Sequence, residues 1–443
     1  MAEWNSMKTK TTQPKFARRD FLKTTGAGLA GWTTLSVLPS WAQGSPNERI
    51  RHAVIGTGNQ GKSHCKSFAQ IKDCEVMALC DVDPERLNQA AALLPNATGV
   101  KKYSDFRLLL RDKTVDTVSI ATCDHWHTPI ALAAILAGKH VYVEKPCSHN
   151  IHESNLLVKA AREHKKCVQH GTQRRSSGQV KAAVQALRDG VIGKVLAAKA
   201  INHQLRKPIG RAPVSEPPAG VNYDLWLGPA PKQRFTRNRW HYNWHWFWDY
   251  GCGDLSNDGI HQLDVARWGL GEDYPKAAVC SGGQLFYDDD HETPDTQTII
   301  YEYGRCHLIY EMRLWTDYAM EGHDNGTIFY GTEGKLEDGR AGVSVTLKDG
   351  QTKKIEGERE SHQANFLNAV RANDPSKLSA PIEVGAVSAN LCHLGNIGTR
   401  LGGQRLEYDP AAHRITRCGG REAEANALLT RNYRAGYELA YQG

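Results

Sequence analysis

The stretch Gly56-Thr57-Gly58-Asn59-Gln60-Gly61 decides the fold of this chain. An apolar run over residues 51–55, typical of a buried strand, comes before it, and a helical pattern over residues 62–71 follows. Asp81 ends the next apolar run, twenty positions after the last glycine. Glycines at this spacing let the backbone approach a pyrophosphate at the start of a helix, and an acidic side chain at this distance can bind a ribose. The stretch therefore predicts a dinucleotide-binding βαβ unit.

The same pattern predicts which nucleotide binds and which residues hold it. The Asp81 carboxylate would accept hydrogen bonds from the adenosine ribose and would repel a 2′-phosphate, so the sequence favours NAD over NADP. The alternative is a plain glycine-rich turn, with Asp81 only ending a strand. The residues expected to surround the pyrophosphate are Gly56, Gly58, Asn59, Gln60 and Gly61.

Two kinds of hydrophobic pattern divide the chain. Apolar runs alternate with helical patterns up to about residue 170, which predicts a doubly wound parallel sheet of the Rossmann type. Beyond residue 171 the runs are longer and separated by Gly and Asp turns, which predicts an α+β domain with a large, open, mostly antiparallel sheet. The expected divisions are a signal peptide at 1–42, an NAD-binding domain at 50–170, a substrate-binding and oligomerisation domain at 171–416 and a C-terminal tail at 417–443.

The N-terminal residues Arg18-Arg19-Asp20-Phe21-Leu22-Lys23 are similar to a twin-arginine export signal. A weakly apolar run follows over residues 24–38, and small residues suited to signal peptidase come next, so cleavage is expected after Ala42. A retained membrane anchor is the alternative, but the run is short and rich in Gly and Thr. The mature protein is therefore expected in the periplasm or another extracytoplasmic compartment, without a membrane partner.

Charge and cysteine usage exclude some classes of protein. The 443 residues carry a formal net charge of +7, of which +4 falls within the first 23 residues, and no dense Lys/Arg block follows. No nucleic-acid partner is therefore expected. The eleven cysteines have no Cys-x-x-Cys spacing, and the histidine pairs His125/His127 and His241/His245 lack a further ligand in the motif. We expect few disulfides and no metal site.

Two longer motifs, over residues 120–129 and 137–146, resemble the Gfo/Idh/MocA oxidoreductase family, which includes glucose-fructose oxidoreductase and inositol dehydrogenase. The similarity continues through residues 223–229 and 251–271. It implies that Lys145, in Glu144-Lys145-Pro146, lies beside the nicotinamide and the substrate hydroxyl. A lysine at the carboxyl end of a parallel strand can orient a hydroxyl and stabilise developing negative charge. The other residues expected to line the cofactor crevice are Thr122, Asp124, His127 and Glu144.

The resemblance also implies a catalytic histidine in the second domain, and His261 matches it. Imidazole suits proton transfer because its ordinary pKa lies near neutral pH. Many family members carry an aspartate four residues before this histidine, where this chain has Asn257. Asparagine can hold a hydroxyl but cannot take a proton, so a carboxylate role would pass to Asp258 or be absent. Asp258 and Asp264 both lie three residues from His261 and could orient its ring.

A segment rich in aromatic residues, 239–248, suits a carbohydrate because indole rings stack on the apolar faces of sugars. Packing between domains is the alternative. Tyr242, Trp248, Asn257, Asp258 and His261 are the substrate-binding candidates, together with Arg174, which follows a strand end near the crevice.

The expected function is an exported, NAD-dependent oxidoreductase that transfers hydride to or from a sugar or sugar derivative. An enzyme outside the cytoplasm has no soluble NAD to exchange, so a tightly bound, internally recycled cofactor is expected. One alternative is an NAD-dependent glycosidase, in which transient oxidation of a sugar permits elimination, hydration and re-reduction. Another is a non-catalytic sugar-binding module with structural NAD. The open second sheet favours a homo-oligomer, a dimer or tetramer.

Overall fold

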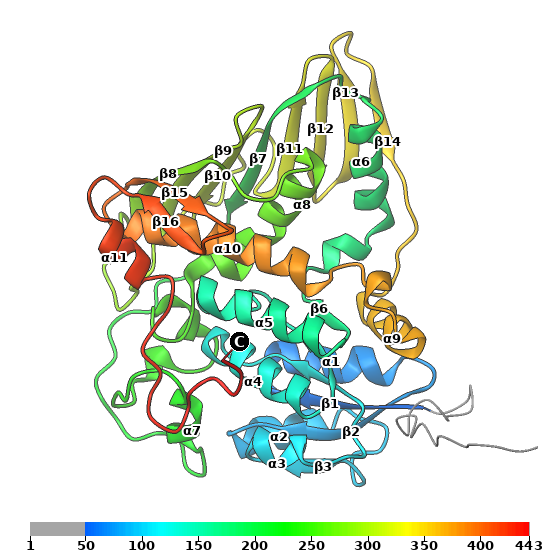
Figure 1. The fold of residues 1–443 in the computed structure, drawn as a ribbon, viewed down its shortest axis with the longest axis vertical. Helices are drawn as coiled ribbons and strands as arrows, with labels where there is room; N and C mark the ends of the chain where they lie inside the picture. Colours follow the sequence, from blue (N-terminus) through cyan, green and yellow to red (C-terminus); the bar gives the residue numbers. More distant parts are fainter. Residues whose placement is uncertain (1–48, 443) are drawn as a thin grey trace, which may run out of the picture. The chain divides into compact units, whose positions relative to one another are not determined.

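The computed structural model describes residues 49–442, and the predicted export signal lies outside them. The first part is the predicted doubly wound unit: six parallel strands in the order β3-β2-β1-β4-β5-β6 (Figure 1). Its strands are β1 (Ile50–Ile55), β2 (Cys74–Cys80), β3 (Lys101–Tyr103), β4 (Thr117–Ile120), β5 (His140–Val143) and β6 (Val168–His170). Its helices are α1 (Asn59–Ala69), α2 (Pro84–Ala91), α3 (Phe106–Leu110), α4 (Asp124–Leu136) and α5 (Ile151–Glu163).

The sequence patterns explain most of this sheet. β4 is buried at every position and β5 at all but one, as expected for central parallel strands. The sequence did not predict β3, because this edge strand begins with two exposed lysines and has no apolar run.

The second part contains the predicted large, mostly antiparallel sheet, with ten strands in the order β14-β13-β12-β11-β7-β10-β9-β8-β15-β16. Within it β7 and β10 pair in parallel, while the neighbouring pairs are antiparallel. The strands are β7 (Val195–His203), β8 (Ala277–Gly283), β9 (Thr296–Glu302), β10 (His307–Arg313), β11 (Asn325–Gly331), β12 (Gly334–Gly339), β13 (Gly342–Leu347), β14 (Thr352–Ile355), β15 (Arg405–Asp409) and β16 (Arg414–Arg417).

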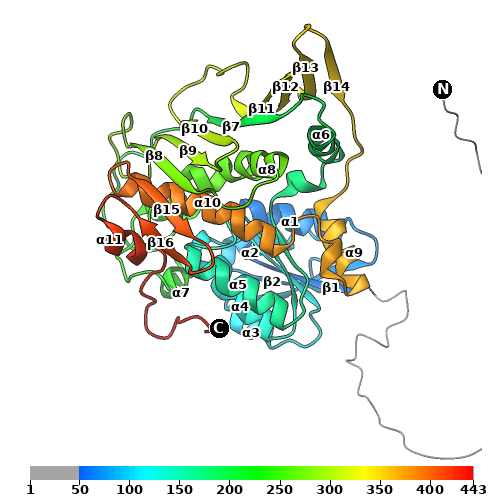
Figure 2. The ribbon, with the colours of Figure 1, turned by 45° about the horizontal axis from the view of Figure 1, so that its top comes forward.

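Helices cover one face of the ten-stranded sheet (Figure 2). α8 packs on β7 and β11, and α10 packs on β8 and reaches α5 of the first part. The α-helices of this part are α6 (Gly178–Arg188), α7 (Tyr223–Leu227), α8 (Ile260–Leu270), α9 (His362–Ala372), α10 (Ile382–Arg400) and α11 (Glu422–Ala427). Shorter 3₁₀ turns are η2 (Gln173–Ser176), η3 (Arg237–Arg239), η4 (His241–Trp246) and η6 (Pro375–Lys377), and η5 (Leu255–Gly259) is a π-helical turn.

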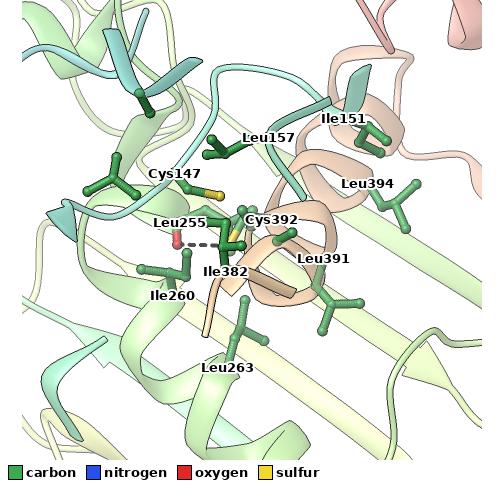
Figure 3. Close-up of a cluster of buried hydrophobic side chains, with 14 of the residues drawn as sticks. Cys147, Ile151, Leu157, Leu255, Ile260, Leu263, Ile382, Leu391, Cys392 and Leu394 are labelled. Carbon is green, nitrogen blue, oxygen red and sulfur yellow. Dashed lines mark hydrogen bonds between the residues drawn. The ribbon is translucent and has the colours of Figure 1, made fainter. Parts of the chain in front are cut away.

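One hydrophobic core joins the two parts. Leu157 on α5, Leu263 on α8 and Leu391 on α10 are fully buried members of the same cluster (Figure 3). The Cys392 thiol, also on α10, donates a hydrogen bond to the carbonyl oxygen of Leu255, 3.5 Å away. Because this core is continuous, the strand end that carries Lys145 and the helix that carries His261 are held at a fixed separation.

Two further observations concern the state of the cysteines and the length and apolarity of the helices. All eleven cysteines lie among the described residues, where they are buried and unpaired by disulfides. Burial raises the pKa of several of these thiols, that of Cys147 to about 12, so they are packing residues and not thiolates. Within residues 49–442 no helix is both long enough and apolar enough to cross a membrane.

Candidate active site

A cavity of about 540 Å³ lies at the carboxyl ends of the parallel strands. The first part contributes the glycine-rich turn, the end of β2, the start of α4 and the strand end at Lys145. The second part contributes η5, His261 and much of the aromatic segment. Most residues predicted for cofactor and substrate line this one cavity: Gly56, Gly58, Asn59, Gln60, Asp81, Thr122, Asp124, His127, Glu144, Lys145, Tyr242, Asn257, Asp258 and His261.

The glycine-rich turn fits a pyrophosphate. Gly56 has a φ of +83°, and a Cβ there would meet the Ala121 carbonyl oxygen at 2.6 Å. A Cβ on Gly58 would meet no described atom within 4 Å, and α1, which starts at Asn59, has no side-chain cap. The free N–H groups at the start of α1 are therefore available to an anion. Gly61 does not line the cavity: a Cβ there would lie 1.9 Å from the Gly56 carbonyl oxygen, so this glycine permits helix–strand packing.

Asp81 is fixed beside this turn. One carboxylate oxygen accepts hydrogen bonds from the backbone N–H and the hydroxyl of Thr57, at 2.6 and 3.0 Å, and the other accepts from the Asp83 N–H. Burial raises the pKa of Asp81, although these donors counteract the shift. Asp81 lines the cavity beside the glycine-rich turn, which is the place where the fingerprint puts the acidic residue that binds a ribose.

Glu144 is a buried hydrogen-bond acceptor in the wall of the cavity. It accepts hydrogen bonds from His64 Nε2 and Gln60 Nε2, both at 2.9 Å, and more weakly from Gln173. Burial alone would raise the pKa of Glu144, but the His64 hydrogen bond and the nearby Lys145 hold it well below its ordinary value. The carboxylate therefore stays charged one residue from Lys145.

The two histidines of the 125–127 motif fasten the backbone. His127 contacts the carbonyl oxygens of Pro146, at 2.6 Å, and Thr122, at 3.1 Å. His125 contacts those of Trp226 and Tyr250. Burial lowers the pKa of His127, and that of His125 to about 3. These rings thus tie the end of β4 to the lysine turn and to the second part. No group of three or more potential metal ligands occurs within the described residues.

Asp124 is an unusual carboxyl group at the floor of the cavity. It is 2 % exposed, and its described hydrogen bond is from the Cys252 N–H at 3.2 Å. Burial raises its pKa from 3.8 to about 8, against the opposing influence of Lys145. Asp124 is therefore largely protonated at neutral pH.

Lys145 is connected to the second part through Asn257. Its Nζ donates to the Asn257 backbone oxygen at 2.5 Å and to the amide Oδ1 at 3.3 Å. The Asn257 amide nitrogen donates in turn to Asp254, at 2.9 Å. Asn257, and not Asp258, therefore faces the lysine.

His261 has the properties of a neutral base. Its Nδ1 is buried without a hydrogen-bond partner among the described residues, and the residue lines the cavity. Burial and the nearby Lys145 ammonium lower its pKa to about 4. The imidazole is therefore unprotonated at neutral pH and can accept a proton.

Neither aspartate orients His261 as the helical spacing predicted. Asp264 instead forms a buried ion pair with Arg175, at 2.7 Å, and accepts a hydrogen bond from Ser388. Despite its burial, the Arg175 charge lowers the pKa of Asp264. Asp258 accepts hydrogen bonds from Gln204 and Asn325, and burial, with Asp254 nearby, raises its pKa.

Two predicted substrate residues lie away from this cavity. Trp248 packs beneath the Arg400 guanidinium, 4.6 Å from the ring centre. Arg174 pairs with Asp338 at a second, polar cavity of about 300 Å³. This second cavity shares Gln204, Asp258 and His261 with the first.

Sequence reasoning missed Arg206 and Gln204, which line the main cavity directly after β7. Arg206 donates to both carboxylate oxygens of Asp254, at 2.9 and 3.1 Å, and to the Tyr242 hydroxyl at 3.2 Å. The available signal was a pair of polar side chains immediately after a strand end. In the aromatic segment Trp240, His241 and Trp244 also reach the cavity.

A Rossmann unit, a second domain with a large open sheet, and a cavity lined by both Lys145 and His261 are the features of a two-domain, dinucleotide-binding protein. The family models agree. Residues 50–172 match the NAD-binding Rossmann fold of the Gfo/Idh/MocA oxidoreductase family, and residues 206–439 match its C-terminal alpha/beta domain. The chain belongs to this family, which confirms the predicted family and its predicted NAD-binding domain.

Three known proteins show what this chain is similar to. A glycosyl hydrolase family 109 protein of Saccharopolyspora erythraea is 32 % identical over 216 residues, which are 43 % of this chain and 47 % of that protein. Myo-inositol 2-dehydrogenase of Thermotoga maritima is 25 % identical over 74 % of this chain and 91 % of its own length. The WlbA dehydrogenase of Bordetella pertussis, in complex with NADH and UDP-GlcNAcA, has a TM-score of 0.62 at 20 % identity, over 82 % of this chain and 99 % of that one. The match to the family 109 protein thus spans about half of that relative's length.

Proposed function

We propose that this protein is an exported, NAD-dependent oxidoreductase that acts on a sugar or sugar derivative and recycles a tightly bound cofactor. One observation carries the proposal: a single cavity holds the dinucleotide fingerprint, Lys145, His261 and a polar, aromatic-edged wall. Inositol- and sugar-nucleotide-directed relatives support a polyhydroxylated substrate.

The residues divide the chemistry between them. Gly58, the start of α1 and Asp81 would hold NAD, which supplies a hydride acceptor when bound. Lys145, directed by Asn257, would orient the substrate hydroxyl and stabilise the negative charge that develops on its oxygen. His261, neutral at physiological pH, would take the hydroxyl proton.

A redox-neutral glycosidase is the second candidate, supported by the family 109 relatives. The second cavity favours it, because it extends the site beyond His261 and could hold a polar leaving group. Export through the twin-arginine signal and self-association through the uncovered face of the ten-stranded sheet complete the proposal.

The test begins with the purified protein as isolated. Denaturation should release NAD or NADH, identified by chromatography, and release of no nucleotide would refute the retained cofactor. The native protein is then incubated, without added NAD, with a panel of sugars that carry deuterium on their carbinol carbons, and the nucleotide released on denaturation is analysed by mass spectrometry. Deuterium on the nicotinamide ring supports catalysis, and its absence for every sugar favours the binding module. Aglycone release from a glycoside panel would identify the glycosidase, whereas dependence on a second sugar would identify the oxidoreductase.

A further inference from the structure

A segment of the second part, residues 220–244, covers one end of the cofactor cavity, and we call it the cover segment. It contains α7 and most of the aromatic segment. Leu225, Trp226 and Trp240 from it line the same cavity as Asp81 and Phe106 of the first part. The cover segment therefore faces the end of the cavity at which Asp81 would bind the adenosine ribose.

The cover segment contacts the loop after β2 directly. The Asn222 N–H donates to the Val82 carbonyl oxygen at 3.2 Å. His241 Nε2 lies 3.7 Å from the Asp83 carboxylate. These contacts fall one and two residues beyond Asp81, so the loop that would hold the ribose is itself held by the cover segment.

The floor of the cavity is fastened to the same segment. The Trp126 indole N–H on α4 donates to the carbonyl oxygens of Leu225 and Trp226, both at 3.1 Å. Gly228, with a φ of +50°, packs against this indole so closely that a Cβ there would lie 2.0 Å from the ring. The cover segment and α4 therefore form one tightly packed wall.

The C-terminal residues 428–441, the tail segment, lock this wall from outside. They run from α11 past α7 towards α4 (Figures 1 and 2). Arg434 donates to the carbonyl oxygens of Gly228, at 2.7 Å, and Asp224, at 2.6 Å, and pairs with the Asp224 carboxylate. Arg431 donates to the His125 carbonyl oxygen at 2.7 Å and pairs with Glu153 at 2.9 Å. One arginine thus holds the cover segment and the other holds α4 and α5.

We propose that the cover segment completes the adenosine side of the NAD site and that the tail segment locks it there, so that the protein retains NAD through its adenosine half. The proposal rests on the NAD-dependent function proposed above. It assigns the aromatic segment a role in holding the nucleotide, in addition to any contact with sugar through Tyr242 or Trp244.

The test uses the Arg434→Gln variant of the full chain, which keeps a polar side chain but removes the ion pair to Asp224. Arg417→Gln is the matched control, because Arg417 on β16 is 72 % exposed and lies 3.8 Å from Glu407. Each protein is loaded with NAD, passed through a desalting column and denatured to measure the nucleotide that remains. Wild type and Arg417→Gln should keep NAD, whereas Arg434→Gln should release it about tenfold faster.

A second measurement identifies which half of the nucleotide is affected. Proteins stripped of nucleotide are titrated with ADP-ribose and, separately, with nicotinamide mononucleotide. The Arg434→Gln substitution should weaken the binding of ADP-ribose about tenfold and leave the binding of nicotinamide mononucleotide unchanged. If Arg434→Gln does not fold, as circular dichroism would show, Tyr437→Phe replaces it. This variant removes only the hydroxyl that donates to Asp224 at 3.1 Å and should speed release a few-fold.

The outcomes separate the two proposals. If the Arg434→Gln protein folds and keeps NAD as well as wild type does, the proposed role of the tail segment is wrong. The same conclusion follows if the variant binds ADP-ribose and nicotinamide mononucleotide more weakly by the same factor. Wild-type protein that loses NAD on the desalting column overturns the retained-cofactor function and this inference with it.

Discussion

Lys145 donates a hydrogen bond to the backbone carbonyl oxygen of Asn257, a residue 112 positions later in the chain. The lysine lies two residues after β5 of the Rossmann unit, and the asparagine lies in the π-helical turn just before α8. A backbone acceptor cannot be lost by substitution, so this contact directs the ammonium group whatever side chain stands at position 257. Turns of this kind interrupt helices frequently at functional sites.

His261 is expected to be essential for proton transfer. His261→Asn should lower the rate of sugar oxidation about 10²- to 10⁴-fold while NAD remains bound. Because its pKa is about 4, the wild-type rate should fall as pH decreases through 4, where the imidazole becomes protonated. Single-turnover formation of NADH measures both effects. His307→Asn, on an exposed position of β10, is the control, and an equal loss in that variant would contradict the role.

Gly58 and Gly61 should respond differently to alanine. The Cβ of an alanine at position 58 would meet no described atom within 4 Å, so the thermal stability of the nucleotide-free protein should hardly change. The new methyl group would, however, occupy the space expected for the pyrophosphate. The affinity of this variant for NAD should fall about tenfold or more. Gly61→Ala drives a Cβ into the Gly56 carbonyl oxygen and should destabilise the protein by about 1–3 kcal/mol even without nucleotide. Thermal unfolding and NAD titration distinguish them, and identical behaviour would show that the two glycines share one role.

Asp124 should make stability depend on pH. Its pKa is raised on folding, from 3.8 to about 8, so the native state binds the proton more tightly than the unfolded state does. Its contribution to stability is complete below pH 4 and is lost as pH rises through 8. Asp124→Asn should therefore raise the free energy of unfolding relative to wild type by about 1 kcal/mol or more at pH 9, and by less at pH 5. Urea denaturation at both pH values measures this, and a pH-independent difference would count against it.

Substitution of Asp264 should affect mainly stability, whereas substitution of Asp258 should affect mainly the reaction with the sugar. The Asp264→Asn substitution removes the charged partner of the buried Arg175 guanidinium and should lower the free energy of unfolding by about 3–5 kcal/mol. The Asp258→Asn substitution should lower the free energy of unfolding far less, because burial already disfavours the charged form of Asp258. This substitution should nevertheless alter the KM for the sugar. Equal destabilisation by the two variants would contradict this division.

The sequence predicted the parts of the site that are local in the chain. Gly58 and Asp81 lie within one βαβ unit, so their spacing alone indicates their positions. Lys145 closely follows the end of β5, and the carboxyl ends of parallel strands meet at one edge of the sheet. His261 was predicted from the resemblance of its surrounding motif to the family.

The parts that depend on distant packing could not be predicted. Asp264 has the helical spacing to reach His261, but Arg175, 89 residues earlier, captures it. Trp248 has the composition of a sugar platform, but its ring is stacked under Arg400, far along the chain. Arg206 follows the end of β7, which is a local signal, but only the place of β7 in the second sheet brings that strand end to the cavity.

The hydrogen bond between Arg431 and the His125 carbonyl oxygen joins residues 306 positions apart. A ribosome that adds about 5–20 residues per second needs roughly 15–60 s to synthesise that length, and N-terminal domains fold during such intervals. The nucleotide-binding floor can thus exist before its outer fastening has been translated. Under the lock proposed above, nucleotide would enter freely during this period, until residues 428–441 have been synthesised and packed against the wall.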